Sequence, residues 1–166
     1  MLKTLELSGF KSFAKKSVLS FERPVTSIVG PNGSGKSNVV EAIRFVLGEQ
    51  SMKSMRGKSG SDLIFKGSKS LGKLNRASVS ITFDNKSKVF KFPQSGTNGG
   101  LGGRDAANID FDDITITREV YADGVSRYLL NGSEVRLKDI LELLTSVHIG
   151  SSGHHITKLS KQIKPE

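Results

Sequence analysis

The segment from Gly30 to Ser37 constrains the fold of this 166-residue chain more than any other. It reads Gly-Pro-Asn-Gly-Ser-Gly-Lys-Ser, which satisfies the G-x-x-x-x-G-K-[ST] pattern of a phosphate-binding loop. The apolar run Val25 to Val29 precedes the loop, and apolar residues at helical spacing follow it from Ser37 to Leu47. A strand, a glycine-rich loop and a buried helix are the context that this pattern requires. The sequence therefore predicts an α/β fold with a phosphate loop at the start of its core helix.

The residue types of this loop fit the binding of a nucleoside triphosphate. Glycines let backbone N–H groups turn toward phosphate oxygens, where the helix N-terminus adds positive potential. Lys36 is expected to contact the β- and γ-phosphates, and the Ser37 hydroxyl is expected to be a Mg²⁺ ligand. The expected binding residues are Gly30, Pro31, Asn32, Gly33, Ser34, Gly35, Lys36, Ser37 and Asn38. Guanine specificity is unsupported, because the only Asn-Lys pair, Asn85-Lys86, lacks the Asp that reads guanine.

The rest of the chain predicts a mixed sheet with an antiparallel meander. Period-two alternation and β-rich runs indicate strands on both sides of the core helix. These strands are expected around Leu2 to Leu7, Val18 to Phe21, Val79 to Phe83, Val89 to Phe90, Ile114 to Tyr121 and Ser126 to Leu130. Turns are expected at Asp123-Gly124 and Asn131-Gly132. A short amphipathic helix is predicted from Ile140 to Val147, a long loop from Ser51 to Gly72, and a flexible Gly-rich insertion at about 93–108.

Composition restricts the classes of function. The chain has no Cys, which excludes a disulfide framework and a thiolate metal site. No apolar run is long enough to cross a bilayer, so we expect a cytoplasmic protein without a membrane partner. The net charge of +9 is uneven, because Arg44 to Arg76 is strongly basic and Arg104 to Glu142 has an acidic excess. A basic face could meet the phosphates of nucleotide or nucleic acid, or it could serve only as a solvated surface.

Several segments together resemble one known family, the SMC (structural maintenance of chromosomes) proteins, and within it the bacterial chromosome-partition members. The resemblance rests on the start Leu5-Glu6-Leu7-Ser8-Gly9-Phe10-Lys11-Ser12-Phe13, the loop Ile28 to Asn38, Ser54 to Gly57, Asp62 to Ser68, the hairpin Ile116 to Gly132, and Val147 to Gly150. It spans roughly residues 1–156. This combination is far more specific than the phosphate loop alone.

The resemblance implies the N-terminal half of an ABC-type P-loop ATPase head. In this family a long coiled coil separates the two halves of a head, and two heads enclose ATP between them. The implied cofactors are ATP and Mg²⁺. The implied partners are a C-terminal half-head, a second head in a dimer, and DNA bound without sequence preference. The implied role is to organise, condense and partition chromosomal DNA, associated with the nucleoid. Arg56 matches the family's arginine loop near the nucleotide, although a solvated loop cation is the alternative.

The sequence departs from the family after Ile156, so we divide it into a half-head at 1–156 and a divergent polar tail at 157–166. The expected Gln-Gly turn, whose Gln helps to hold Mg²⁺ and the attacking water, is missing, and Gln162 is displaced from its place. Truncation, a frameshift or an artificial chain end would each explain this tail. Because the family's signature motif and Walker B acid are also absent, we expect the chain alone to lack turnover and name no catalytic residue.

Two other interpretations remain open. The chain could be the head of a related recombination or repair ATPase, or a non-catalytic fragment that binds a partner head or DNA. A metal site at His148, His154 and His155 is disfavoured, because adjacent residues point in different directions and no carboxylate or Cys cluster accompanies them.

Overall fold

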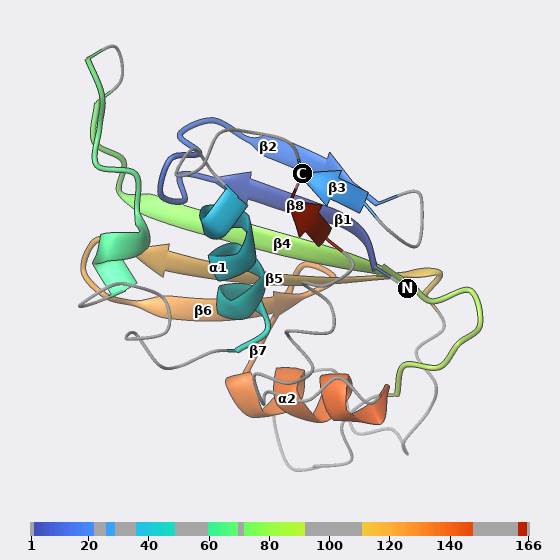
Figure 1. Cartoon of the computed structure of the whole chain (residues 1–166). Helices are drawn as coiled ribbons and strands as arrows, with labels where there is room; N and C mark the ends of the chain where they lie inside the picture. The colour runs from blue at the N-terminus through green and yellow to red at the C-terminus, as the bar shows by residue number, and fades with distance from the viewer. Residues whose placement is uncertain are drawn as a thin grey trace.

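A computed structural model of the chain describes residues 2–21, 26–28, 36–48, 60–69, 72–91, 111–147 and 163–165. Its largest element is a six-stranded sheet with the strand order β2-β1-β4-β5-β6-β7 (Figure 1). The strands are β1 (Leu2–Ser8), β2 (Ser17–Ser20), β4 (Arg76–Asp84), β5 (Asp113–Tyr121), β6 (Ser126–Leu130) and β7 (Ser133–Val135). All neighbours in this sheet are antiparallel. The predicted meander is therefore confirmed as β4 to β7.

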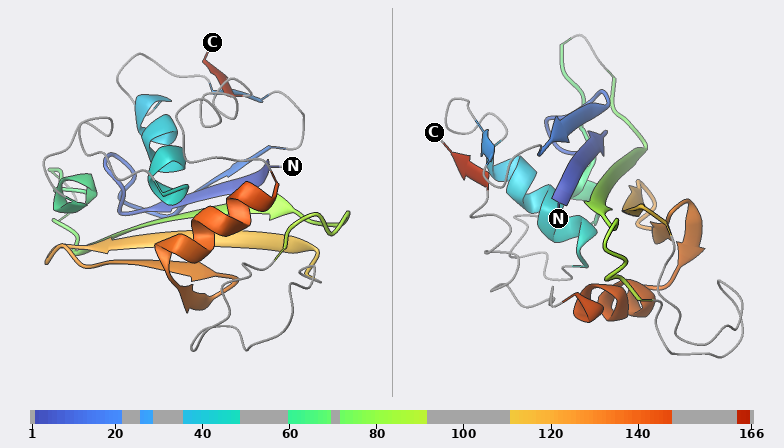
Figure 2. Two further views of the ribbon diagram at one scale, coloured as in Figure 1. Left: turned by 90° about the horizontal axis from the view of Figure 1, so that it is seen from below. Right: turned by 90° about the vertical axis from the view of Figure 1, so that its right-hand side faces the viewer.

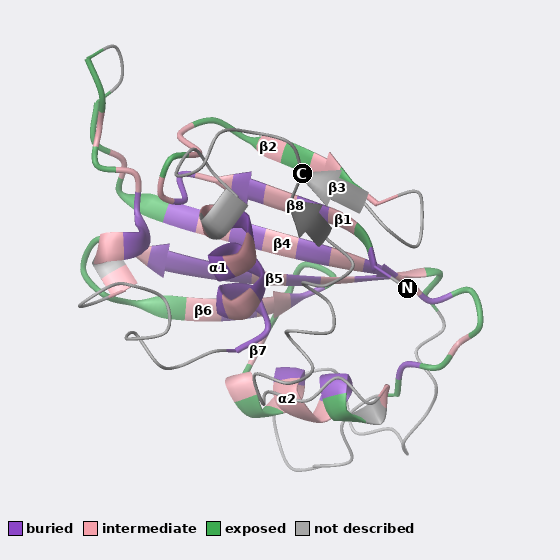
Figure 3. Ribbon diagram, viewed as in Figure 1, coloured by how far each residue is buried: buried purple, intermediate pink, exposed green. Residues whose placement is uncertain are grey.

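The two faces of the sheet differ in polarity, as the alternating strand pattern predicts. On β4 the buried residues are Ala77, Val79, Ile81 and Phe83. The residues between them are polar, and their hydroxyls pair across the strands: Ser80 lies 2.7 Å from Thr117, and Thr82 lies 3.0 Å from Thr115. Figure 3 shows this alternation as buried and half-buried bands along β4. One face therefore forms the core, and the other carries ladders of small polar side chains.

Two helices cover the apolar face of the sheet (Figure 2, left). The core helix α1 (Lys36–Val46) contacts β4 and β5, and α2 (Leu137–Ser146) contacts β6. The side chains of Ile43, Phe45 and Val46 are fully or almost fully buried. Gly48 ends the first helix with a φ of 94°, a conformation that favours glycine. The predicted helix from Ser37 to Leu47 and its glycine stop are thus confirmed to within one residue.

A second, smaller sheet lies apart from the first. It consists of β3 (Thr26–Ile28) and β8 (Ile163–Pro165), which pair in parallel. Figure 2 shows this pair on the same side of the large sheet as α1. Parallel and antiparallel pairing are therefore both present, as a mixed α/β fold requires, but in separate sheets. The strand β8 falls within the segment that the sequence assigned to a polar tail, so the sequence analysis did not predict it.

Two local predictions were wrong. No strand forms at Val89 and Phe90. β4 ends at Asp84, and the side chain of the next residue, Asn85, is hydrogen-bonded to the chain on both sides of the following turn. The Asn85 side chain accepts a hydrogen bond from the Phe90 N–H at 3.3 Å and donates one to the Phe111 carbonyl at 2.8 Å. The predicted loop from Ser51 to Gly72 contains a short 3-10 helix, Gly60–Leu63, in its described part. The predicted insertion at 93–108 lies outside the described residues.

Candidate nucleotide-binding site

The phosphate-loop pattern lies between β3 and α1, in the strand–loop–helix order that its chemistry requires. Strand β3 ends at Ile28, and the helix begins at Lys36. The first turn of α1 contains no acidic residue. The positive end of the helix dipole is therefore not offset by a carboxylate in the first helical turn, which suits an anionic ligand.

Most of the predicted contacts themselves are beyond what the structure describes. The backbone of Lys36 and Ser37 forms the first two positions of α1, but their side chains are outside the described part, so the assignment of Ser37 to Mg²⁺ stays a prediction. The following predicted binding residues lie outside the described residues altogether: Gly30, Pro31, Asn32, Gly33, Ser34, Gly35 and Arg56. Gln162 and the three His residues lie outside them as well.

Asn38 is the one predicted binding residue whose side chain is described. It is half-buried in the first turn of α1, and its Nδ2 donates a hydrogen bond of 2.9 Å to Ser12 Oγ. Ser12 lies in the connection between β1 and β2, twenty-six positions earlier in the chain. The amide of Asn38 therefore links the start of the helix to this connection.

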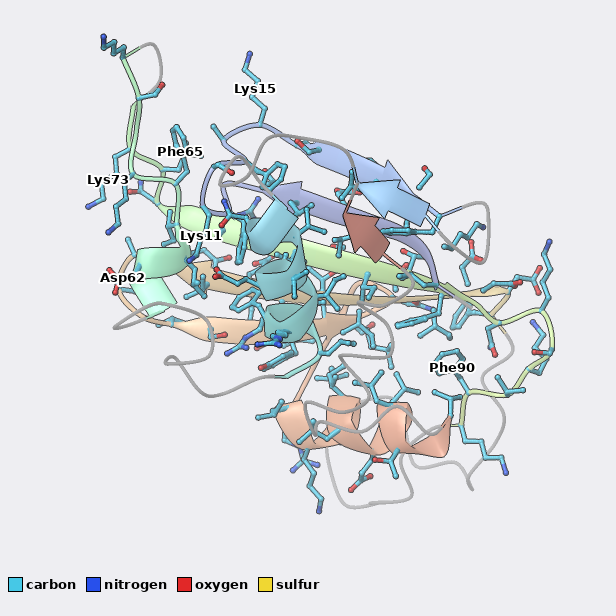
Figure 4. All side chains as sticks on the ribbon, viewed as in Figure 1. Lys11, Lys15, Asp62, Phe65, Lys73 and Phe90 are labelled. Carbon is cyan, nitrogen blue, oxygen red and sulfur yellow. The ribbon has the colours of Figure 1, made fainter. Side chains whose placement is uncertain are left out.

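A second contact joins the same two segments one turn further along the helix. Lys11 Nζ lies 2.6 Å from Glu41 Oε2, and both side chains are largely buried. Figure 4 shows Lys11 beside α1, whereas Lys15 from the same connection points away from the body of the protein. A buried ion pair holds its partners in one geometry, because loss of either would leave a buried charge alone. The connection after β1 is thus tied to α1 at Asn38 and at Glu41.

The backbone of this connection is held from its other side by residues around Ile64. Lys11 N–H donates to the Leu63 carbonyl at 2.7 Å, and Phe65 N–H donates to the Gly9 carbonyl at 2.7 Å. Phe10 is fully buried, and its ring lies 5.5 Å from that of Phe45 on α1. Sequence reasoning did not select Lys11 or Ser12 as site residues. No local pattern indicates them, because only the tertiary fold brings them to the helix.

Arg118 supports the far end of α1. Its Nη1 donates a hydrogen bond of 2.9 Å to the Phe45 carbonyl, and its guanidinium lies 4.3 Å from the centre of the Phe45 ring and 4.9 Å from that of Tyr128. Burial lowers the pKa of Arg118 below its ordinary value, yet that value is so high that the side chain stays charged. A cation at the C-terminal end of a helix interacts favourably with the helix dipole. The helix that begins at the phosphate loop is therefore fixed at both ends.

The described part of the chain shows neither a metal-binding cluster nor a membrane-spanning helix. It contains no group of three or more His, Cys, Asp or Glu side chains placed to hold a metal ion. None of its helices has the length and apolar character needed to span a lipid bilayer.

Comparison with known proteins supplies the family. The profile of the RecF/RecN/SMC N terminal domain matches residues 1–153. The chromosome partition protein Smc of Halothermothrix orenii is 47% identical over 160 residues, which cover 96% of this chain and 12% of that protein. The Smc protein of Bacillus subtilis is 42% identical over 160 residues, with the same two coverages. The chain thus spans about an eighth of the length of these relatives.

Solved structures agree in fold. An Smc head domain from Pyrococcus furiosus, with an extended coiled coil and bound to the C-terminal domain of ScpA, has a TM-score of 0.79 and 42% identity, covering 96% of this chain and 38% of that one. A chain described in work on ATP-driven dimerisation and DNA-stimulated activation of SMC ATPases has a TM-score of 0.77 and 41% identity, covering 96% and 90%.

The recombination mediator RecF, solved with ATP, is more distant. It has a TM-score of 0.55 at 23% identity, covers 84% of this chain and 29% of its own, and therefore shows a common fold alone. The SMC relatives share far more sequence over nearly the whole chain, which decides between the two family interpretations. The predicted fold class is confirmed, since the SMC heads share the P-loop ATPase fold. The chain belongs to the SMC family, and its residues 1–153 match the RecF/RecN/SMC N terminal domain.

Proposed function

We propose that this chain binds ATP with Mg²⁺ through residues 30–37 and serves as one half of an SMC-type head that organises chromosomal DNA. The observation that carries the proposal is the position of the phosphate-loop pattern between β3 and α1. The first helical turn there contains no carboxylate and is bonded to Ser12 through Asn38, and the next turn is paired with Lys11 through Glu41. ATP and Mg²⁺ supply phosphoryl-transfer chemistry, and the head supplies their positioning.

Each part of the loop has a role in this proposal. The backbone N–H groups of the glycines bind the phosphate oxygens, and Lys36 adds a positive charge at the β- and γ-phosphates. Ser37 holds Mg²⁺ through its hydroxyl, and Arg56 approaches the nucleotide from the loop that follows α1. The contacts at Asn38 and Glu41 keep the start of the helix fixed against the sheet, which maintains the loop in its binding geometry.

Lys36→Ala tests the nucleotide site. Removing a charge-assisted contact costs about 1.5–3 kcal/mol, so the affinity for ATP should fall by about tenfold to a hundredfold. Calorimetric titration of the whole chain with Mg·ATP measures this change. Lys58→Ala, another Gly-flanked loop lysine, is the control and should bind as the parent does. An unchanged affinity in Lys36→Ala would exclude the phosphate-loop assignment.

Non-specific DNA binding is the second part of the proposal. Within the basic segment from Arg44 to Arg76, the described residues Lys66, Lys69 and Lys73 are exposed on an extended arm that projects from the body. Figure 1 shows this arm, and Figure 4 labels Lys73 on it. Exposed lysines on a projecting arm can neutralise backbone phosphates, and no helix in the described part is placed as a reader of base edges.

A triple Lys→Gln change at 66, 69 and 73 tests the arm. Affinity for a duplex of arbitrary sequence should fall. The slope of log affinity against log salt concentration should decrease in magnitude by at most about three, since each lysine accounts for at most one phosphate contact. The matched control changes three exposed lysines elsewhere, Lys86, Lys91 and Lys138, which carry the same total charge. Fluorescence anisotropy at several salt concentrations provides both numbers. An affinity that does not depend on salt would contradict the proposal.

The competing class of function is an interaction fragment that keeps the fold but binds no nucleotide. In that case neither the parent chain nor Lys36→Ala would show ATP binding in calorimetry. Both would still associate with a partner half-head. Measurement of ATP binding with and without a C-terminal half-head separates the two.

A further inference from the structure

The parallel pair of β3 and β8 joins two segments that lie far apart in the sequence. β3 leads directly into the phosphate loop, whereas β8 lies ten residues beyond the matched N-terminal domain, which ends at residue 153. The register joins Thr26 to Ile163, Ser27 to Lys164 and Ile28 to Pro165. In the part of the chain that the structure describes, β3 pairs with no strand other than β8. The segment after the conserved domain therefore provides the neighbour of the strand that carries the nucleotide site.

A strand in this position ordinarily has two neighbours. Parallel sheets are covered by helices on both faces, and the strand before a phosphate loop lies inside such a sheet, not at its edge. Two short paired strands are too few for an independently stable sheet. The chain covers 38% of the solved Smc head with which it shares its fold. The larger part of that head is therefore not matched by this chain, and it can supply further strands to this parallel sheet.

We propose that β8 occupies, in cis, an edge of β3 to which the complementary half of an SMC head adds a strand, so that β8 must be released when the two halves join. This inference rests on the function proposed above and adds a regulatory step to it. The partner is a parallel β-strand, which recognises β3 through backbone hydrogen bonds. An unpaired edge exposes N–H and C=O groups, and β8 covers them until that partner arrives.

The register also makes β8 easy to displace. It is three residues long, and Pro165 has no N–H to donate to the ladder at its last pair. That pair contains Ile28, the last residue of β3, so the ladder lacks a potential donor at the end nearest the phosphate-loop pattern. Elements with few backbone hydrogen bonds open with low free energy. A longer strand from the complementary half would therefore replace β8 without unfolding the six-stranded sheet.

The test uses proline substitutions in the whole chain. In a parallel ladder, only every second residue of a strand points its N–H group toward a given neighbour. Ile163→Pro and Lys164→Pro are therefore made as separate variants, and one of the two removes a donor that faces β3. Lys161→Pro is the matched control, since it adds a proline beside β8 without altering its three residues. Hydrogen exchange at Thr26–Ile28 reports the pairing directly, and exchange at Arg76–Asp84 confirms that the large sheet is intact.

We expect slow exchange at Thr26–Ile28 in the parent and in Lys161→Pro, and faster exchange in at least one β8 variant. The C-terminal half-head of the Halothermothrix orenii relative is then titrated into each chain. If β8 covers the edge in about 90% of molecules, its removal should tighten the apparent affinity about tenfold. Equal exchange in all four chains would show that β8 does not hold β3. Faster exchange without tighter association would show that the partner uses another surface. Either result overturns the inference.

The two proposals fail in different ways. If the proposed nucleotide site is wrong, Lys36→Ala will bind ATP as the parent does. Hydrogen exchange at Thr26–Ile28 can still be measured in that case. Failure of the β8 inference appears in that exchange pattern or in the association with the half-head, whatever the affinity for ATP.

Discussion

At the scale of single residues, charged side chains occupy places where the strand pattern alone indicates a core. Arg118 lies on the helix-covered face of β5 and contacts Phe45 and Tyr128 through the flat surface of its guanidinium. Arginine suits this place because it stays charged, stacks on aromatic rings and donates in several directions. The neighbouring Glu119 points to the opposite face, where only 8% of its side chain is exposed. Arg118 and Glu119, which are adjacent on β5, therefore lie in different polar environments on opposite faces of the sheet.

Glu119 provides a prediction about pH. Burial disfavours ionisation of its carboxyl, but hydrogen bonds from Arg127 at 2.9 Å and Tyr121 at 2.8 Å outweigh burial and hold the pKa of Glu119 below its ordinary value of 4.5. A lowered pKa in the folded state stabilises the protein above the unfolded-state pKa, and this contribution is lost as the pH falls through the folded-state pKa. Glu119→Gln should therefore be less stable than the parent by about 1–2 kcal/mol at pH 7.

Chemical denaturation at several pH values measures this contribution. The gap between the parent and Glu119→Gln should be constant from pH 7 to about pH 5 and should close below pH 4.5. The control is Glu134→Gln, an exposed glutamate on β7, which should track the parent throughout. A gap that widens toward acid pH would mean that the hydrogen bonds do not favour the charged form.

At the scale of elements, the connection after β1 links the antiparallel sheet to the helix that follows the phosphate-loop pattern. β1 pairs with β4, and at the end of β1 the chain turns at Gly9 and passes under α1. The same turn accepts a hydrogen bond from Phe65 and supplies Lys11 and Ser12 to the helix. The turn thus joins the sheet, the 3-10 helix region and α1. A change here should affect the whole assembly of elements.

Gly9→Ala tests that connection. Gly9 has a φ of 66°, and an added Cβ would lie 2.3 Å from the Arg76 carbonyl oxygen of β4, which is backbone and cannot move away. Gly124, with a φ of 89°, has open space around the same position. Gly124→Ala should cost about 1 kcal/mol, from the backbone conformation alone. Gly9→Ala should cost at least about 2 kcal/mol more, because the strand must shift. Urea unfolding of both variants measures the difference, and equal losses would refute the close approach of β4.

At the scale of the whole molecule, we predict that this chain, which spans about an eighth of the length of its relatives, binds nucleotide without completing the reaction. Phosphoryl transfer needs charge neutralisation and a water positioned in line with the transferred group. We expect the phosphate loop to supply only the first of these. The expected Gln-Gly turn is missing after Ile156, and the family's signature motif and Walker B acid are not in this sequence. We therefore expect turnover only when the Gln-Gly turn and the C-terminal half-head are both supplied.

Steady-state phosphate release from four samples tests this requirement. They are the chain alone, the chain with a C-terminal half-head, the chain with a Gln-Gly turn restored after Ile156, and that repaired chain with the half-head. Turnover above background is expected only in the fourth sample. Lys36→Ala in the same background should abolish it. Turnover in the first sample that depends on Lys36 would show that the chain is a complete ATPase by itself.

Features that depend on local pattern could be predicted from the sequence. The core helix with its Gly48 stop, the meander and the second helix all follow from periodicities and turn residues read within a few positions, and the phosphate loop stays a prediction. The contacts between distant segments became evident from the folded structure. It joined Lys11 to Glu41, brought Arg118 under Phe45 and placed the tail strand β8 beside β3. Such contacts depend on how separate segments pack and which edges remain unpaired after packing, and no short stretch of sequence carries that information.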